Sequence, residues 1–180
     1  MKSQNFTKPF LFAIDGKCGS GKSTLAQVLS EQLHAPVISL DDFFLPLELR
    51  TPERKLSPGG NVHYERFISE VLEPLRAGRE VRYGVFDCSE MKIRSYKTLP
   101  LSDCYIIEGS YSMRPDFLSF YNMALLLGCT EAIQKDRIAK RNGPEGLKMF
   151  LEQWIPLENH YFTDLYGDYA PNEDHLFYIC

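Results

Sequence analysis

Short apolar runs along the chain alternate with segments in which apolar residues recur at helical spacing. The apolar runs predict buried β-strands at residues 10–14, 37–40, 104–107, 123–127 and 176–179. The helical spacing predicts helices from the end of residues 16–23 to about Leu33, from Asn61 to Gly78, and over residues 130–142 and 143–166. Alternating strands and helices are typical of an α/β fold with a parallel, doubly wound sheet that helices cover on both faces.

Two segments depart from this alternation. Residues 45–61 are rich in Pro, Gly and charged residues, and they predict a long connection that runs over a functional site. Residues 80–99 contain two β-prone pieces, 81–86 and 92–99, which predict a β-hairpin arm beside the sheet.

The later helices also have predicted boundaries and cores. We expect Asn61 to cap its helix, with Pro74 and Gly78 at its end. In the helix at 143–166 we expect Pro156 to kink the helix or split it in two, and we expect a buried stripe of apolar side chains, comprising Leu147, Phe150, Leu151 and Trp154.

The strongest chemical signal is residues 16–23, which read GKCGSGKS and fit the P-loop pattern. Glycines allow the backbone to wrap a triphosphate closely, and Lys22 adds a positive charge for the β- and γ-phosphates. The Ser23 hydroxyl can bind Mg²⁺. The residues predicted to bind the phosphates of ATP are Gly16, Gly19, Ser20, Gly21, Lys22, Ser23 and Thr24.

Carboxylates follow two later strands. Asp41 and Asp42 follow the strand at 37–40, and Glu108 follows the strand at 104–107. In an open α/β sheet, ligands bind at the carboxyl ends of the strands, so these groups should meet the P-loop there. Glu108 is then the expected ligand of Mg²⁺ together with Ser23. A solvated turn or a helix cap for the aspartates, and an edge carboxylate paired with an Arg for Glu108, are the alternatives.

Phosphoryl transfer needs a phosphate cradle, a metal, a base near the acceptor hydroxyl and cations for the developing charge. The sequence offers Asp41 as the base, and Lys22, Arg137 and Arg141 as the cations. Arg137 and Arg141 lie four residues apart and share a helical face, in a basic segment at 130–142 that we interpret as a lid. A solvated helix face is the alternative for this segment.

Composition narrows the function further. A length of 180 residues is typical of a single domain, and the net charge of −4 does not favour nucleic acid or an anionic membrane as partner. We expect no signal peptide and no membrane span. The 5 cysteines form no CxxC pair and suggest reduced thiols in the cytoplasm, with Cys18 inside the P-loop as a thiol of undecided reactivity.

Most of the chain, from the first strand to the helix around Trp154, resembles the uridine kinase family of P-loop kinases, a group related to nicotinamide riboside kinases and phosphoribulokinases. The motifs that carry the resemblance are GKCGSGKS, LDDFF, NVHYERF, EGSY and the Arg-rich segment at 137–141. The resemblance implies ATP as donor, Mg²⁺ as cofactor, and the 5′-hydroxyl of a nucleoside such as uridine as acceptor. It implies Asp41 as the base and acceptor contacts around Phe43, Glu65, Phe86 and Asp87.

The resemblance is weaker at the acceptor. Where uridine kinases have Tyr-Asp-Phe followed by a His that contacts the pyrimidine, this chain has Phe86-Asp87-Cys88 and then Met91. A nucleoside monophosphate kinase or another small-metabolite kinase is therefore an alternative, with Arg50, Arg54 and Lys55 as candidates for an acceptor phosphate. A nucleotide-binding regulator without transfer activity is an alternative of another class, although the Asn-Lys-x-Asp guanine motif of GTPases is absent. The partners expected are ATP and a small acceptor, and a homo-oligomer is compatible with the sequence.

Overall fold

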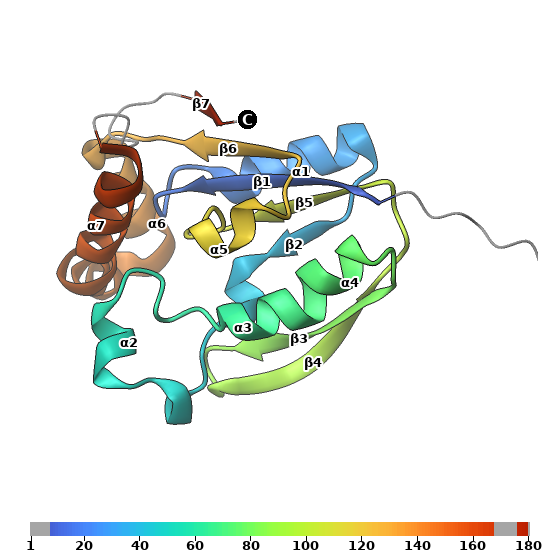
Figure 1. Cartoon of the computed structure of the whole chain (residues 1–180). Helices are drawn as coiled ribbons and strands as arrows, with labels where there is room; N and C mark the ends of the chain where they lie inside the picture. The colour runs from blue at the N-terminus through green and yellow to red at the C-terminus, as the bar shows by residue number, and fades with distance from the viewer. Residues whose placement is uncertain (1–7, 168–175, 180) are drawn as a thin grey trace, which may run out of the picture.

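A computed structural model describes residues 8–167 and 176–179. Its centre is a sheet with the strand order β2-β5-β1-β6-β7 (Figure 1). The strands β1 (Phe10–Gly16), β2 (Val37–Ser39), β5 (Cys104–Glu108) and β6 (Met123–Leu127) are parallel, and β7 (Leu176–Ile179) pairs antiparallel with β6. The predicted parallel α/β architecture is therefore confirmed, and every predicted strand is present with an end shift of two residues or fewer.

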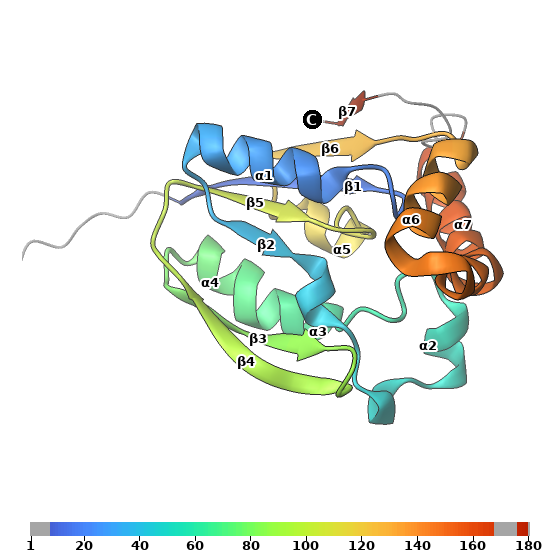
Figure 2. The same ribbon diagram turned by 180° about the vertical axis from the view of Figure 1, so that it is seen from behind.

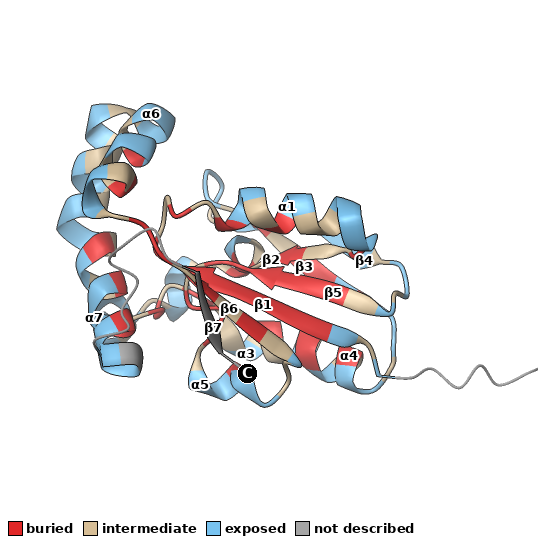
Figure 3. Ribbon diagram, turned by 90° about the horizontal axis from the view of Figure 1, so that it is seen from above, coloured by how far each residue is buried: buried red, intermediate tan, exposed pale blue. Residues whose placement is uncertain are grey.

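Alternation along the strands explains how the sheet separates two layers of core. Leu11 and Ala13 of β1 point to one face, and Phe12 and Ile14 point to the other. The helix α1 (Lys22–Leu33) covers the face of Phe12 and Ile14 and buries Ala26 there (Figure 2). Both faces of the strands are consequently buried, as Figure 3 shows for the centre of the sheet.

The opposite face is covered by one long helical segment and a short helix. The segment comprises α3 (Tyr64–Phe67), a π-helical turn η3 (Ile68–Leu72) and α4 (Glu73–Arg76), and the short helix is α5 (Pro115–Leu118). The apolar side chains of this segment face the sheet: Phe67, Val71, Leu72 and Leu75 are buried, and Tyr64 and Ile68 are partly buried against them. The cap is corrected: His63 precedes the helix, and its Nδ1 accepts from the Arg66 N–H at 3.4 Å. Pro74 lies in the first turn of α4, which ends at Arg76, and Gly78, with φ +64°, follows two residues later.

The hairpin arm is confirmed as the antiparallel pair β3 (Val81–Asp87) and β4 (Lys92–Leu99), which lies beside α3 and α4 (Figure 1). The connection at 45–61 is more regular than expected. It contains a 3₁₀ turn η2 (Leu47–Leu49) and a short helix α2 (Pro52–Leu56). Arg54 holds this connection by donating to the Gly60 and Val62 carbonyls and pairing with Glu65 at 2.9 Å.

Two long helices stand at the carboxyl ends of the strands (Figures 1 and 3). They are α6 (Glu131–Met149) and α7 (Ile155–Tyr166), joined by a π-helical segment η4 (Phe150–Trp154). Gly143, with φ +71°, breaks α6 where the predicted lid ends, and Pro156 lies in the first turn of α7, where the predicted helix divides into two elements. The predicted buried stripe is wrong: Leu151 is 38% exposed, and Leu147, Phe150 and Trp154 are only half-buried.

Candidate nucleotide and acceptor site

The P-loop lies between β1 and α1, and its shape depends on glycine. Gly16, Gly19 and Gly21 have φ values of +148°, +78° and +102°. A Cβ atom on Gly16 would lie 2.1 Å from the Leu127 carbonyl oxygen of the neighbouring strand β6. The loop therefore passes closer to the sheet than any side chain would allow.

The cradle side of the loop presents backbone donors. The N–H groups of Lys22, Ser23 and Thr24 lie in the first turn of α1 and have no acceptor within the helix. These three residues, with Gly19 and Gly21, line a cleft of about 780 Å³. Gly16 and Ser20 lie outside that lining, and the Ser20 hydroxyl is buried without a hydrogen-bond partner among the described residues. Free N–H groups at a helix start, with an unpaired hydroxyl beside them, fit an anion such as a phosphate.

Lys22 is folded back onto the loop. Its Nζ donates to the Gly16 and Lys17 carbonyls at 2.8 and 2.9 Å, and to Ser110 Oγ at 3.3 Å. Lys22 is only 7% exposed, because the backbone carbonyls hold its ammonium group inside the loop. A phosphate in the cradle would offer Lys22 a charged acceptor in their place.

The predicted metal ligands are in contact with one another. The Ser23 hydroxyl lies 3.0 Å from Glu108 Oε2, and Ser39 of β2 donates to Glu108 Oε1 at 2.6 Å. A hydroxyl and a carboxylate are hard oxygen ligands, as Mg²⁺ prefers, and Mg²⁺ usually takes one or two protein carboxylates plus phosphate and water. Among the described residues no group of three or more His, Cys, Asp or Glu could hold a metal by itself. The donor set thus fits Mg²⁺ bound together with a phosphate.

The two aspartates after β2 have different environments, because the 3₁₀ turn η1 (Leu40–Phe43) directs them apart. Asp42 accepts from Lys97 Nζ at 2.8 Å and from the Tyr83 hydroxyl at 3.2 Å, which ties η1 to the hairpin. Asp41 lines the cleft and has no ion pair or side-chain hydrogen bond among the described residues. Its carboxylate is open to solvent but surrounded by the cleft walls, and this loss of hydration raises its pKa, helped by the negative charge of Glu108.

The basic segment contributes two arginines with different roles. Arg137 Nη1 donates to the carbonyls of Gly19 and Ser20 at 2.9 and 3.1 Å, so α6 rests on the outside of the P-loop. Arg141 lines the cleft, and its positive charge, like that of Lys22, opposes the rise in the pKa of Asp41 without cancelling it. The structure therefore brings Lys22, Ser23, Asp41, Glu108, Arg137 and Arg141 into one cleft.

The residues expected around the acceptor are placed differently. The predicted acceptor contact Phe43 does not line the cleft. It is fully buried and stacks on Tyr83 with ring centroids 5.0 Å apart, and Phe44 lines the cleft instead. Glu65 is turned to Arg54, away from the lining. Phe86 is buried and packs edge-on against Phe44 at 6.4 Å.

Asp87 also lies outside the lining, in the hairpin turn. Its carboxylate accepts from the Ser89 hydroxyl and from the Ser89 and Glu90 N–H groups, and these hydrogen bonds lower its pKa to about 2. Cys88 and Met91 from the same turn line the cleft in its place.

Sequence reasoning missed several residues of the site. Asp15 is fully buried and accepts from the N–H groups of Gly16, Tyr111 and Met113 and from the Tyr161 hydroxyl, at 2.7 to 2.9 Å. Burial raises its pKa to about 6, against the opposing effect of these hydrogen bonds. Glu158 and Ser110 contact the loop as well. The Asp-Gly at the end of the first strand was the one available signal for Asp15, whereas Glu158 had none.

The surroundings of Cys18 bear on the reactivity of its thiol. Burial, together with the charge of Glu158, raises the pKa of this thiol far above its ordinary value. Its Sγ lies 3.4 Å from Gln134 Nε2. We therefore expect little thiolate on Cys18 at neutral pH, and low reactivity.

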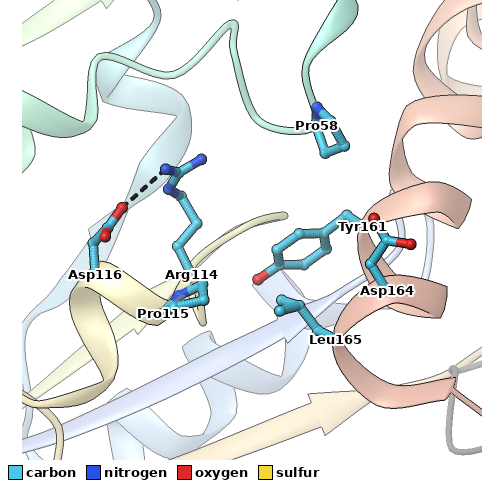
Figure 4. A pocket seen from close by; sticks show the side chains of 7 residues that line it. All are labelled: Pro58, Arg114, Pro115, Asp116, Tyr161, Asp164 and Leu165. Carbon is cyan, nitrogen blue, oxygen red and sulfur yellow. Dashed lines mark hydrogen bonds and ion pairs between the residues drawn. The ribbon is translucent and has the colours of Figure 1, made fainter.

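A smaller hollow of about 290 Å³ lies between α5 and α7 (Figure 4). It is lined by Pro58, Arg114, Pro115, Asp116, Tyr161, Asp164 and Leu165. Arg114 turns to Asp116 at 2.9 Å, and none of the P-loop residues reaches this hollow. The large cleft is therefore the candidate site.

The strand order, the loop between β1 and α1, and the carboxylates at the strand ends define a P-loop NTPase fold. No protein-family profile and no curated protein sequence matches the chain. Solved structures do match it. One of a possible uridine kinase from Bacillus stearothermophilus superposes with a TM-score of 0.67 at 20% identity, over 92% of this chain and 90% of that one.

Another similar structure is a candidate fructose transport system kinase from Silicibacter sp. TM1040. It has a TM-score of 0.66 at 22% identity and covers 88% of each chain. The YGR205w protein has a TM-score of 0.56 at 16% identity, over 96% of this chain and 90% of that one. At identities this low, the superpositions establish a shared fold and nothing further.

Among the described residues, no helix combines the length and apolar character needed to cross a bilayer.

Proposed function

We propose that the protein is an ATP- and Mg²⁺-dependent kinase that transfers the γ-phosphate to a hydroxyl group of a small acceptor. The observation that carries this proposal is the Asp41 carboxylate, which has no ion pair or side-chain hydrogen bond within residues 8–167 and 176–179 and lines the same cleft as the P-loop cradle. A switch protein or a regulator has no need of an unpartnered carboxylate opposite its phosphates. A kinase needs one to orient the acceptor hydroxyl and take its proton.

Each protein group then has a part in the transfer. The backbone N–H groups at the start of α1 hold the phosphates, and Ser23 and Glu108 hold Mg²⁺, which neutralises phosphate charge when bound. Asp41 binds the acceptor hydroxyl. Lys22 and Arg141 supply positive charge near the transferred group.

Part of the cleft lining is apolar or aromatic. Phe44, Met91, Tyr111, Met149, Phe150 and Trp154 form this part. Aromatic side chains suit a flat ring, so a nucleoside or a related riboside is the acceptor that we propose first. The uridine kinase description of the structural neighbour from Bacillus stearothermophilus agrees with this choice.

A second acceptor class is favoured by Arg50. This side chain lines the cleft, its Nε donates to the Leu45 carbonyl at 2.7 Å, and it has no ion-pair partner among the described residues. A guanidinium held in this way can bind a carboxylate or a phosphate. Arg54 is engaged by Glu65, and Lys55 is exposed and outside the lining, so the alternative of an anionic acceptor depends on Arg50.

A phosphotransfer screen tests both classes. Purified protein with ATP and Mg²⁺ is offered nucleosides, ribosides, nucleoside monophosphates and pantothenate, and the products are identified by mass. Transfer to neutral nucleosides that survives Arg50→Ala supports the first class. Transfer to an anionic acceptor whose KM rises at least about tenfold in Arg50→Ala, but not in the surface control Arg79→Ala, supports the second. ATP hydrolysis without any phosphorylated acceptor would refute the proposed transfer.

A further inference from the structure

A buried carboxylate occupies part of the P-loop. Glu158 of α7 is 3% exposed, and its Oε1 and Oε2 lie 3.1 and 3.0 Å from the Cys18 backbone nitrogen. Oε1 also accepts from Ser110 Oγ at 2.9 Å. Gln134 Nε2 lies 3.4 Å from Oε2. These donors to Glu158 are a backbone amide, a hydroxyl and a side-chain amide, and burial lowers the pKa of Lys17, which lies near enough for the charge of Glu158 to oppose this fall.

This position is unusual for a carboxylate. The amides of a P-loop are arranged for the oxygens of a phosphate, yet here the Cys18 amide of the loop donates to Glu158, and both residues line the same cleft as the cradle. Ser110 links the carboxylate to the Lys22 ammonium group, since Ser110 Oγ lies 3.3 Å from Lys22 Nζ. Glu158 is therefore held against the P-loop and is linked through Ser110 to Lys22, the cation that a triphosphate would use. Like charges at such distances repel strongly where water is excluded.

We propose that Glu158 is an internal anion that competes with the nucleotide phosphates for the P-loop. Binding of a triphosphate displaces its carboxylate from the Cys18 amide, and this competition lowers the affinity for nucleotide. The inference rests on the proposed ATP-dependent function, because it assumes that phosphates enter this cradle. It assigns Glu158 a role in regulating access rather than in the transfer itself.

The contacts of α7 show what displacement would disturb. Tyr161, three residues after Glu158, donates its hydroxyl to Asp15 Oδ2 at 2.8 Å. Gln134 of α6 donates to the Cys18 carbonyl at 3.0 Å. Both long helices are therefore docked on the P-loop beside Glu158, so its release loosens one of their attachments. Nucleotide binding and the position of α6 and α7 become linked.

The test compares wild type with Glu158→Gln, which keeps the shape of the side chain and an acceptor oxygen but removes the charge. Isothermal titration measures the Kd of MgATP and of inorganic tripolyphosphate, which has no base to contact the cleft walls. We expect Glu158→Gln to bind both ligands at least about tenfold more tightly than wild type. Glu152→Gln, an exposed position before α7, is the matched control and should bind like wild type.

The outcomes separate the competing interpretations. Affinity unchanged within about twofold, or weaker, in a Glu158→Gln protein with normal circular dichroism and Tm would overturn the proposal, because a carboxylate that only braces the loop predicts weaker binding. Glu158→Ala provides a second measurement if Glu158→Gln does not fold. Failure of wild type and all variants to bind tripolyphosphate and MgATP would instead refute the phosphate cradle, and with it the proposed function.

Discussion

Asp41 and Asp42 are adjacent carboxylates, and the structure predicts opposite effects of the same substitution at the two positions. Asp41→Asn removes the base from the cleft, so we expect kcat to fall by about 10²–10⁴-fold, the usual contribution of general-base catalysis. Because Asp41 has no ion pair or side-chain hydrogen bond among the described residues, the free energy of unfolding should change by no more than about 0.5 kcal/mol. The affinity for ATP should stay near that of wild type.

Asp42→Asn is the matched control. It weakens the ion pair with Lys97, which is half exposed and worth up to about 1 kcal/mol, and the hydrogen bond from Tyr83, worth about 1 kcal/mol. A loss of about 1–2 kcal/mol lowers the Tm of a chain this long by roughly 2–8 °C. The folded variant should still transfer phosphate, since Asp42 is turned to the hairpin.

Thermal unfolding and a coupled assay of ADP release, run with an acceptor found in the screen, measure both effects. The pH profile adds an independent readout. Because the surroundings and Glu108 raise the pKa of Asp41, activity should fall on the acid side at a higher pH than an ordinary aspartate would give. Wild-type turnover in Asp41→Asn, or a dead but folded Asp42→Asn, would refute this assignment of the base.

Further predictions concern the loop and its supports. Lys22→Ala should weaken ATP binding about 10- to 100-fold and reduce transfer, measured through the emission of Trp154, the chain's 1 tryptophan, which lines the cleft; unchanged affinity would contradict the cradle. Asp15→Asn should cost about 2–4 kcal/mol of unfolding free energy, because an amide NH₂ would face buried donors. The pKa of Asp15 near 6 lies above its unfolded value, so its stabilisation is full below about pH 4 and lost through pH 6. The difference in unfolding free energy between wild type and Asp15→Asn should therefore be about 1 kcal/mol larger at pH 5 than at pH 7, and an equal difference would refute the shifted titration. Iodoacetamide at pH 8 should modify exposed Cys88 well before Cys18, as peptide mass spectrometry can measure; faster labelling of Cys18 would contradict its burial.

The strands and the P-loop could be predicted because their signals are local. A buried parallel strand is a short apolar run, and the loop is a contiguous pattern of glycines followed by Lys22 and Ser23. Glu108 could be placed for the same reason, since it directly follows an apolar run. These features need no knowledge of which distant segments meet.

The acceptor side could not be predicted in the same way. Phe43 and Phe44 are adjacent aromatic residues, and only the 3₁₀ turn η1 decides that Phe43 enters the core while Phe44 lines the cleft. The apolar residues Phe150 and Trp154 recur at helical spacing, which predicts that they are buried in the core. In the structure they line the cleft. Periodicity identifies the apolar side of a helix. It does not tell whether that side packs in the core or lines a cleft.

The P-loop is braced from outside by groups that approach from distant parts of the sequence. Arg137 satisfies its carbonyls, Gln134 and Glu158 hold Cys18, and Asp15 accepts from the Gly16 N–H. Such bracing fixes the loop before any ligand arrives, so a ligand does not have to order it. Glu158 differs from the other braces because it carries the same charge as the expected ligand. Under the competition that we propose, linkage requires that docking of α7 on the loop lowers the affinity for nucleotide by the same factor by which bound nucleotide disfavours docking of α7.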